Sequence, residues 1–207
     1  MTKIAIVGNA PFKIDLADDI DEADIVVRFN NAHGFGQDRG ARVDDLFLVN
    51  CGGQPLEWMR TQDFWDQPHV IATPKVTLPI ASQSGHEFAT WEKAGNPTEI
   101  DGVNFENELR TKLERMGKVV QTLPRQTYSK ACRTVANPDG RFTSAEPSTG
   151  FLATFHYLNT ARQDDAIELF GFGFAGWGGH AWQRECAWVE QQEAIGKLIW
   201  RRPPEIG

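Results

Sequence analysis

Residues 3–30 carry the sequence KIAIVGNAPFKIDLADDIDEADIVVRFN, in which an acidic segment separates two apolar runs. Lys3–Val7 and Ile25–Phe29 are short apolar runs of the kind that form buried strands. The acidic segment Lys13–Ala23 lies between them and has helical character. A strand, a helix and a second strand within about thirty residues predict a β-α-β unit with parallel strands.

The rest of the chain continues this alternation of strands and helices. Further strands are expected at Leu46–Val49, Val70–Ala72, Val119–Leu123 and Ala166–Phe170, and helices at Leu56–Trp65, Phe105–Met116, Phe151–Ala161 and Ala181–Ile199. The pattern predicts an α/β sandwich with a mostly parallel central sheet, in a single domain spanning residues 1–207. Thr73–Gly102 is rich in proline and glycine without a sustained period, so we expect a lid or loop there, and Asn137–Gly140 predicts a turn.

Composition narrows the class of protein. The 207 residues include 21 basic and 28 acidic side chains, for a formal charge of −7, and this acidic balance argues against a nucleic-acid partner. No apolar stretch approaches the 18 or so residues of a membrane-spanning helix. Cys51, Cys132 and Cys186 are few, odd in number and widely spaced, which is typical of free thiols in a reducing compartment. We therefore expect a cytoplasmic protein.

Two turns with small residues are candidate ligand-binding segments. Gly8, Asn9 and Ala10 directly follow the first predicted strand, where loops of a parallel sheet form the ligand crevice. Ser148, Thr149 and Gly150 precede an apolar helical run, and a helix start with hydroxyl groups is suited to an anion. A plain strand-to-helix turn and an unliganded helix cap are the respective alternatives.

Gly171-Phe172-Gly173-Phe174-Ala175-Gly176 follows a predicted strand and matches GxGxxG. This pattern suggests an NAD(P)-dependent oxidoreductase as an alternative function. However, Trp177, Gly178 and Gly179 come next, so no helix begins inside the motif as a pyrophosphate site requires. About thirty residues remain, too few for the rest of a dinucleotide-binding unit.

Among the histidines, His180 is the candidate general base. It follows the glycine-rich loop and has Glu185 five residues further on, where a carboxylate could orient the imidazole. His69 is expected at the surface and His156 in the core. Of the tryptophans near His180, Trp177 is the ligand candidate and Trp188 is expected to pack in the core.

Asp19-Ile20-Asp21 resembles a metal-binding DxD string, but its acidic helical setting favours a solvated helix face. The other histidines and carboxylates show no metal-ligand spacing, so neither a metal nor another cofactor is expected.

Taken in order, these segments resemble the motifs of the animal-type sialyltransferases. Val7-Gly8-Asn9, Ile20-Asp21, Asp24, Val27–Asn30 and Gly40-Ala41-Arg42 are similar to the large sialyl motif. Residues 147–150 with Ile167–Gly173 resemble the small motif, and His180 with Glu185 resembles the very small motif, His-x4-Glu. The three come in the family's order and cover about half of the chain.

The resemblance implies an inverting, metal-independent glycosyltransferase of short bacterial type with a variant GT-A or Rossmann-like fold. Its donor would be a CMP-linked 2-keto sugar acid of sialic acid or Kdo type, and its acceptor a glycan or glycolipid in polysaccharide biosynthesis. The matched positions imply substrate or nucleotide contacts for Gly8, Asn9, Ala10, Arg28, Asn30, Ser148, Thr149, Gly150, Gly171, Phe172 and Gly173. They also imply a catalytic role for His180 and Glu185, with His180 as the base.

The departures from the family are also informative. Ile4 and, approximately, Asp164 occupy the places of the family's disulfide cysteines, in agreement with a reducing compartment. No transmembrane anchor is evident, and the family's separate His-Tyr motif is missing. His180 therefore corresponds either to the base or to that second histidine, and Glu185 favours the base. A nucleotide-binding module without catalysis is a further alternative.

Overall fold

The computed structural model describes residues 1–11, 14–82, 103–136 and 146–202. These residues form one seven-stranded sheet in which every strand runs parallel to its neighbours. The strands are β1 (Lys3–Val7), β2 (Ile25–Phe29), β3 (Asp45–Phe47), β4 (Lys75–Leu78), β5 (Val119–Thr122), β6 (Ala166–Phe170) and β7 (Ile199–Arg201). The predicted α/β fold with a parallel, Rossmann-like sheet is confirmed.

The strand order defines where a ligand site is expected. Across the sheet the order is β5-β4-β3-β2-β1-β6-β7. The chain moves outward from β1 to β5 and then returns to place β6 on the other side of β1, so the switch point lies between β1 and β6. Ligands of open α/β sheets bind beyond the carboxyl ends of the strands at such a point. Val7 pairs with both Arg28 and Phe170, so the loops after β1, β2 and β6 start at one level.

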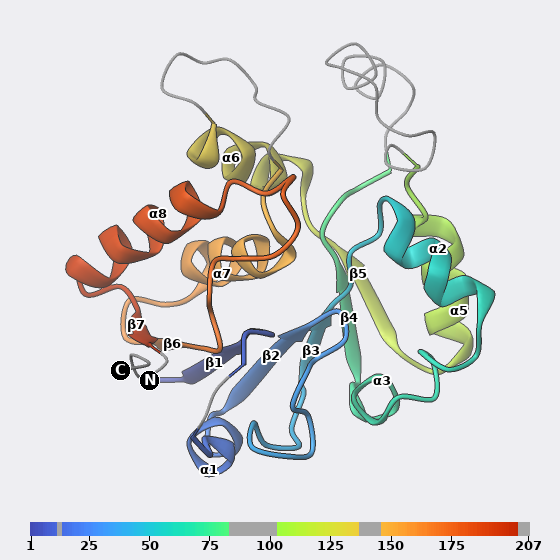
Figure 1. Ribbon diagram of the computed structural model, residues 1–207, viewed down its shortest axis with the longest axis horizontal. Coiled ribbons are helices and arrows are strands. Elements are labelled where there is room, and N and C mark those ends of the chain that lie inside the picture. The colour runs from blue at the N-terminus through green and yellow to red at the C-terminus, as the bar shows by residue number, and fades with distance from the viewer. Residues whose placement is uncertain (12–13, 83–102, 137–145, 203–207) are drawn as a thin grey trace.

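Most of the helices gather in two groups around the sheet, and the short helix that includes Ile20 packs separately against β1 and β2 (Figure 1). The described helices are α1 (Ala17–Asp21), α2 (Gly53–Arg60), α3 (Pro68–Ala72), α5 (Glu106–Arg115), α6 (Arg125–Val135), α7 (Thr149–Thr160) and α8 (Trp182–Ala194). Helices α6, α7 and α8 lie together near β1 and β6, whereas α2, α3 and α5 lie near β4 and β5. None of the described helices is long and apolar enough to cross a bilayer.

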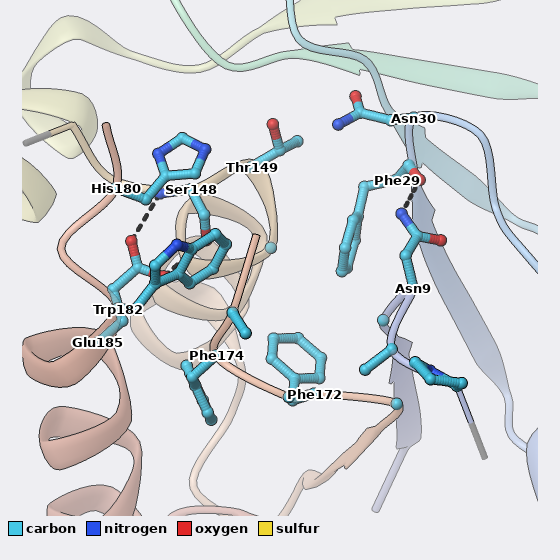
Figure 2. Close-up of a pocket in the computed structure, with 17 residues that line it drawn as sticks. Asn9, Phe29, Asn30, Ser148, Thr149, Phe172, Phe174, His180, Trp182 and Glu185 are labelled. Carbon is cyan, nitrogen blue, oxygen red and sulfur yellow. Dashed lines mark hydrogen bonds between the residues drawn. The ribbon is translucent and has the colours of Figure 1, made fainter. Parts of the chain in front are cut away.

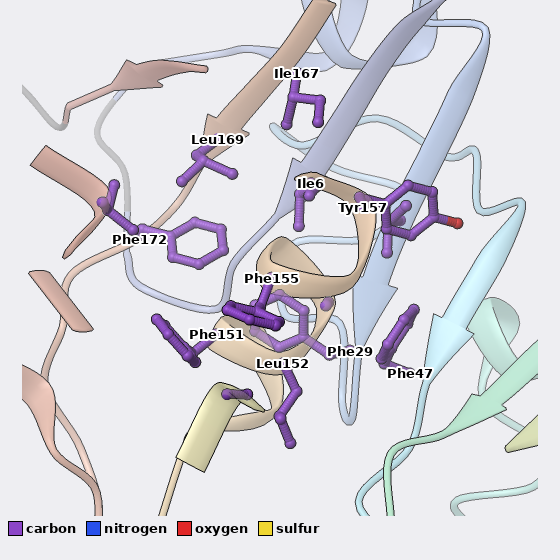
Figure 3. Close-up of a cluster of buried hydrophobic side chains, with 14 of the residues drawn as sticks. Ile6, Phe29, Phe47, Phe151, Leu152, Phe155, Tyr157, Ile167, Leu169 and Phe172 are labelled. Atoms are coloured by element: carbon purple, nitrogen blue, oxygen red, sulfur yellow. The ribbon is translucent and has the colours of Figure 1, made fainter. Parts of the chain in front are cut away.

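Side-chain alternation along the strands supplies the core on both faces of the sheet. Ile6, Val27 and Phe47 are buried against α7, and the neighbouring positions of β1 and β2 belong to a separate cluster that includes Ile20 of α1. Helix α7 is itself buried along most of its length, which explains why its apolar residues are not confined to one stripe. Figure 3 shows its aromatic side chains beneath the strands. The start of α7 is thereby held firmly next to the sheet.

Some local predictions were wrong at identifiable points. Val70–Ala72 lies in helix α3, because Pro68 occupies its first turn, where a fixed φ favours a helix. The strand predicted there is instead Lys75–Leu78, so the interval 73–102 begins with a strand inside the sheet and is not a loop throughout. Residues 83–102, and the turn predicted at 137–140, lie outside the described residues.

The ends of several helices also differ from the sequence prediction. Helix α2 ends at Arg60 instead of Trp65. Helix α8 ends at Ala194, and Gly196, with a φ of 72°, allows the chain to turn into β7. Helix α6 and strand β7 were not predicted.

Candidate active site

An open cleft of about 880 Å³ lies at the switch point of the sheet. Five segments distant in the sequence meet there: the loops after β1, β2 and β6, the start of α7 and the start of α8 (Figure 2). The lining residues are Gly8, Asn9, Ala10, Pro11, Phe29, Asn30, Ser148, Thr149, Gly150, Gly171, Phe172, Gly173, Phe174, Ala175, His180, Trp182 and Glu185. All the site residues predicted from the sequence are among them, with the exceptions of Arg28 and the ligand candidate Trp177.

The loops after β1 and β6 are joined by their backbones. Gly8 N–H donates to the Phe170 carbonyl at 2.6 Å, and Ala10 N–H donates to the Gly171 carbonyl at 3.0 Å. A Cβ atom at Gly8 would lie 2.1 Å from the Gly171 oxygen, well inside van der Waals contact. Gly8 is therefore required for the close approach of two strand-end loops, in addition to any contact with a ligand.

Arg39, which no sequence motif marks as functional, supports the loop after β1 through its side chain. Its buried guanidinium donates to the Gly8 carbonyl at 2.9 Å and to the Ala10 carbonyl. Because these two carbonyls bind Arg39, the position of the β1 loop depends on a residue in the sequence that follows β2. No local signal in the sequence links Arg39 to this loop.

Asn9 joins the β1 loop to the loop after β2. Its side-chain nitrogen donates to the Phe29 carbonyl at 3.1 Å, and its side-chain oxygen accepts from the His33 amide at 2.9 Å. Each of these polar atoms retains further hydrogen-bonding capacity. Asn9 is therefore held firmly at the wall of the cleft, where it can still contact a ligand.

The start of α7 is built around Ser148 and Glu185. Ser148 Oγ accepts from the Phe151 amide at 3.1 Å, which caps the helix. The two Glu185 oxygens accept from the Ser148 amide at 2.7 Å and from Ser148 Oγ at 2.6 Å. Because Thr149 and Gly150 belong to the first turn and line the cleft, their amide groups are suited to an anion.

This arrangement corrects the role expected for Glu185. Its fully buried carboxylate contacts Ser148 and does not orient His180. Burial raises the pKa of Glu185, and the hydrogen bonds from Ser148 oppose that rise. The carboxylate therefore joins α8 to the start of α7.

We expect Glu185→Ala to destabilise the protein by about 1–3 kcal/mol, because the Ser148 amide and hydroxyl would remain buried without their acceptor. Chemical denaturation measures this change. Glu190→Ala removes an exposed carboxylate from the same helix and should change stability by less than about 0.5 kcal/mol. Equal effects of the two substitutions would contradict the structural role of Glu185.

His180 is oriented by a backbone carbonyl. Its Nδ1 lies 2.9 Å from the Glu146 oxygen, and because a carbonyl only accepts, Nδ1 carries the hydrogen and Nε2 is left as an acceptor. Burial lowers the pKa of His180 from its usual 6.5, so the imidazole is neutral at neutral pH. Figure 2 shows the ring at the cleft next to Ser148 and Thr149. A neutral imidazole with a free nitrogen is suited to accepting a proton.

Aromatic rings form another part of the wall. Phe172 lies edge-on to Phe29, with 5.8 Å between the ring centroids, and contacts Phe174 at the same separation. Trp182 lies 4.9 Å from the His180 ring and lines the cleft. These faces offer apolar surface to a nucleobase or sugar ring.

The predictions for Trp177 and Trp188 had different outcomes. Trp177, the expected ligand candidate, is 59% exposed, covers Gly179 and does not line the cleft. Trp182 takes the place next to the cleft, because α8 begins there. Trp188 packs against Phe151 as expected of a core residue.

Arg28 does not contact the cleft, contrary to the prediction. The side chains of β2 alternate, so Phe29 lies on the cleft side and Arg28 on the opposite side. The fully buried Arg28 guanidinium donates to the Arg42, Arg39 and Gly40 carbonyls at 2.7, 2.5 and 3.2 Å. Burial lowers its pKa to about 10. Arg28 therefore stabilises the loop that follows β2.

The acidic DxD segment lies in α1, away from the cleft residues. Asp19 is exposed, in agreement with the solvated helix face that we expected. Asp21 accepts from the Ala41 and Arg42 amides at 2.8 and 3.0 Å, which ties α1 to the loop before β3. Within the described ranges, histidine, cysteine, aspartate and glutamate do not form a group of three suited to a metal ion.

Comparison of the sequence with known proteins identifies a relative of similar length. No known protein-family profile matches the chain. The urease operon 23 kDa accessory protein of Rhizobium meliloti (strain 1021) is 27% identical over 203 residues, covering 94% of this chain and 90% of that protein. The name assigns that protein to a urease operon and states no reaction.

Sialyltransferases are among the solved structures that resemble this chain. A mammalian sialyltransferase matches 96% of this chain and 68% of its own, with a TM-score of 0.58 and 18% identity. CstII from Campylobacter jejuni, solved with cytidine-5'-monophosphate, covers 100% of this chain and 82% of its own, with a TM-score of 0.56 and 14% identity. Cst-I from the same organism covers 100% and 78%, with a TM-score of 0.58 and 13% identity. The chain therefore has the fold of these sialyltransferases.

Proposed function

We propose that the protein is a glycosyltransferase that moves a 2-keto sugar acid from a CMP-linked donor to a hydroxyl group of a glycan or glycolipid. The observation that carries this proposal is the convergence of the β1 loop, the β6 loop, the start of α7 and His180 around one cleft. The loops offer a surface for a nucleotide, the start of α7 offers donors for an anion, and His180 is suited to act as a general base. The sialyltransferase fold supports the same assignment.

The phosphate or the sugar carboxylate would bind at the start of α7. The amides of Thr149 and Gly150 and the hydroxyl of Thr149 are donors at a helix N-terminus, where the dipole favours negative charge. The same donors would stabilise charge that develops on the leaving phosphate. Because CMP carries a single phosphate, this mechanism needs no bridging metal ion.

The nucleoside would extend along the loops after β1 and β6. Asn9 and Asn30 would provide polar contacts, and the adjacent Gly171, Phe172 and Gly173 would provide backbone and apolar contacts. Gly173 lies close to Ala10, because a Cβ on Gly173 would come within 2.9 Å of the Ala10 Cβ. A larger residue at Gly173 would therefore displace the β1 loop.

His180 Nε2 would accept the proton of the acceptor hydroxyl. The acceptor oxygen forms a bond to the anomeric carbon of the sugar acid, and the bond from that carbon to the phosphate oxygen breaks. CMP leaves with the electron pair of that bond. A single displacement of this kind inverts the configuration at the anomeric carbon.

Calorimetric titration with CMP and with NAD tests the nucleotide assignment. We expect saturable binding of CMP and none of NAD. Binding of NAD without CMP would favour the oxidoreductase suggested by Gly171–Gly176 and would falsify the proposal.

A nucleotide-binding module without catalysis is the second candidate, because the Rhizobium meliloti relative is named as an accessory protein. Such a module would bind CMP but would neither hydrolyse nor transfer a CMP-linked sugar acid. Release of CMP from CMP-sialic acid and CMP-Kdo, with and without glycan acceptors, separates the two functions.

The pH dependence of transfer follows from the lowered pKa of His180. The neutral imidazole is the active form, so kcat/KM should be constant near neutral pH. It should fall about tenfold per pH unit below a pKa that is less than 6.5. An acid limb with its midpoint above 6.5 would contradict the assigned environment of His180.

A further inference from the structure

His69, expected at the surface, is buried next to the cleft without lining it. It lies in α3, its side chain is 3% exposed, and its ring packs 6.0 Å from Phe35 and 5.9 Å from Phe64. A buried polar ring among aromatic residues is costly unless it is hydrogen-bonded. The hydrogen-bond partner of the His69 ring therefore indicates what the residue does.

That partner is the backbone of Asn30, a cleft residue. His69 Nε2 lies 3.1 Å from the Asn30 carbonyl oxygen. Because a carbonyl only accepts, Nε2 carries the hydrogen and donates it. Burial lowers the pKa of His69 to about 4, so the ring is neutral at physiological pH.

Asn30 has an unusual backbone conformation that this hydrogen bond helps to fix. Its φ is 52°, in the left-handed region that non-glycine residues rarely adopt. The Asn30 amide donates to the Phe47 carbonyl at 2.9 Å, and its side-chain oxygen accepts from the Val49 amide at 2.9 Å. The Asn30 amide and side-chain oxygen are therefore both hydrogen-bonded to residues at the end of β3, and the side-chain nitrogen is available to a ligand. Figure 2 shows this nitrogen directed across the cleft toward Thr149.

We propose that His69 is a positioning residue of the nucleotide site, which acts by holding Asn30 in its left-handed conformation with the side-chain nitrogen directed into the cleft. This inference rests on the proposed function, because it assigns to Asn30 a contact with the CMP part of the donor. His69 itself does not touch the ligand.

A double-mutant cycle tests this coupling. We expect His69→Phe and Asn30→Ala each to weaken CMP binding about five- to tenfold, the loss of roughly one hydrogen bond. The double variant should bind CMP no more weakly than Asn30→Ala alone, because His69 acts through Asn30. His69→Gln retains an N–H donor and should keep CMP affinity within about threefold of the wild type. Thermal unfolding curves identify a temperature at which all the variants are folded, and CMP affinities are compared at that temperature.

Kinetics supply a readout that a merely structural role would not produce. The His69→Phe substitution should raise the donor KM and leave kcat within about twofold, because the base and the acceptor are not affected. Additive losses in the cycle, or an unchanged CMP affinity in folded His69→Phe, would overturn the role of His69 while leaving the proposed function in place. If the His69→Phe protein does not fold, a full loss of CMP affinity in folded His69→Gln would overturn the role of His69. Absence of CMP binding by the wild-type protein would instead overturn the proposed function and this inference with it.

Discussion

Replacement of His180 by alanine should lower the rate of sugar transfer by about 10²–10⁴-fold, the usual contribution of a general base. CMP affinity should stay within about twofold of the wild type, because the imidazole receives the acceptor proton and the nucleotide binds elsewhere in the cleft. The change is measured as single-turnover transfer from CMP-sialic acid or CMP-Kdo, with CMP affinity measured by calorimetry on the same sample.

His33→Ala is the matched control for this experiment. It removes an exposed imidazole whose backbone amide contacts Asn9, and transfer should remain within about twofold of the wild type. Full turnover in His180→Ala would show that another group accepts the proton. A loss of CMP affinity as large as the loss of rate would show that His180 contributes to binding instead.

Substitution of Gly8 by alanine should destabilise the protein by about 3 kcal/mol, the upper part of the range for overpacking. The added Cβ would lie 2.1 Å from the Gly171 oxygen and 2.6 Å from the Gly171 carbonyl carbon. Both are backbone atoms of the loop after β6, so no side-chain rotation can relieve the clash. The β1 and β6 loops would separate at the switch point, with loss of the 2.6 Å hydrogen bond between Gly8 and Phe170.

This destabilisation corresponds to a fall in Tm of roughly 6–12 °C for a domain of about 200 residues. CMP binding should fall with it, since both loops line the cleft. Gly53→Ala is the control, because a Cβ there meets no atom within 4 Å at the start of α2. It should leave the free energy of unfolding unchanged or raise it by less than about 1 kcal/mol. A Gly8→Ala protein as stable as this control would contradict the close approach of the loops.

Much of the fold follows from patterns that are local in the sequence. The strands β1, β2 and β6 are mostly apolar because both faces of the sheet are covered, and such runs can be recognised without a structure even where Arg28 or Glu168 interrupts them. The failure at Val70–Ala72 has a local cause as well, because two β-branched residues favoured a strand where Pro68 begins a helix. Helix α6 was missed although Tyr128, Ala131 and Val135 share one of its faces, because its sequence is mostly polar and only Ala131 and Val135 are buried.

The candidate site could be predicted in outline for a related reason. In a parallel sheet, each loop at the carboxyl end of a strand reaches the same edge, so small residues after β1 and β6 can be assigned to one cleft from their position alone. The side-chain contacts that hold those loops could not be predicted. Arg39 hydrogen-bonds to the Gly8 loop and His69 to Asn30. Both contacts form only because strand order and helix packing bring residues together that are distant in the sequence.

The sequence alone determined the alternation of strands and helices, the segments that end at one edge of the sheet, and the presence of a histidine near that edge. Those properties depend on residue type and short-range periodicity. The tertiary structure alone decided that Glu185 binds Ser148, 37 residues away, that Arg28 lies on the far side of β2, and that the Glu146 carbonyl orients His180. The reason is physical: a buried polar group takes whichever partner the packed elements bring within about 3 Å, and that distance is fixed only once the whole sheet has formed.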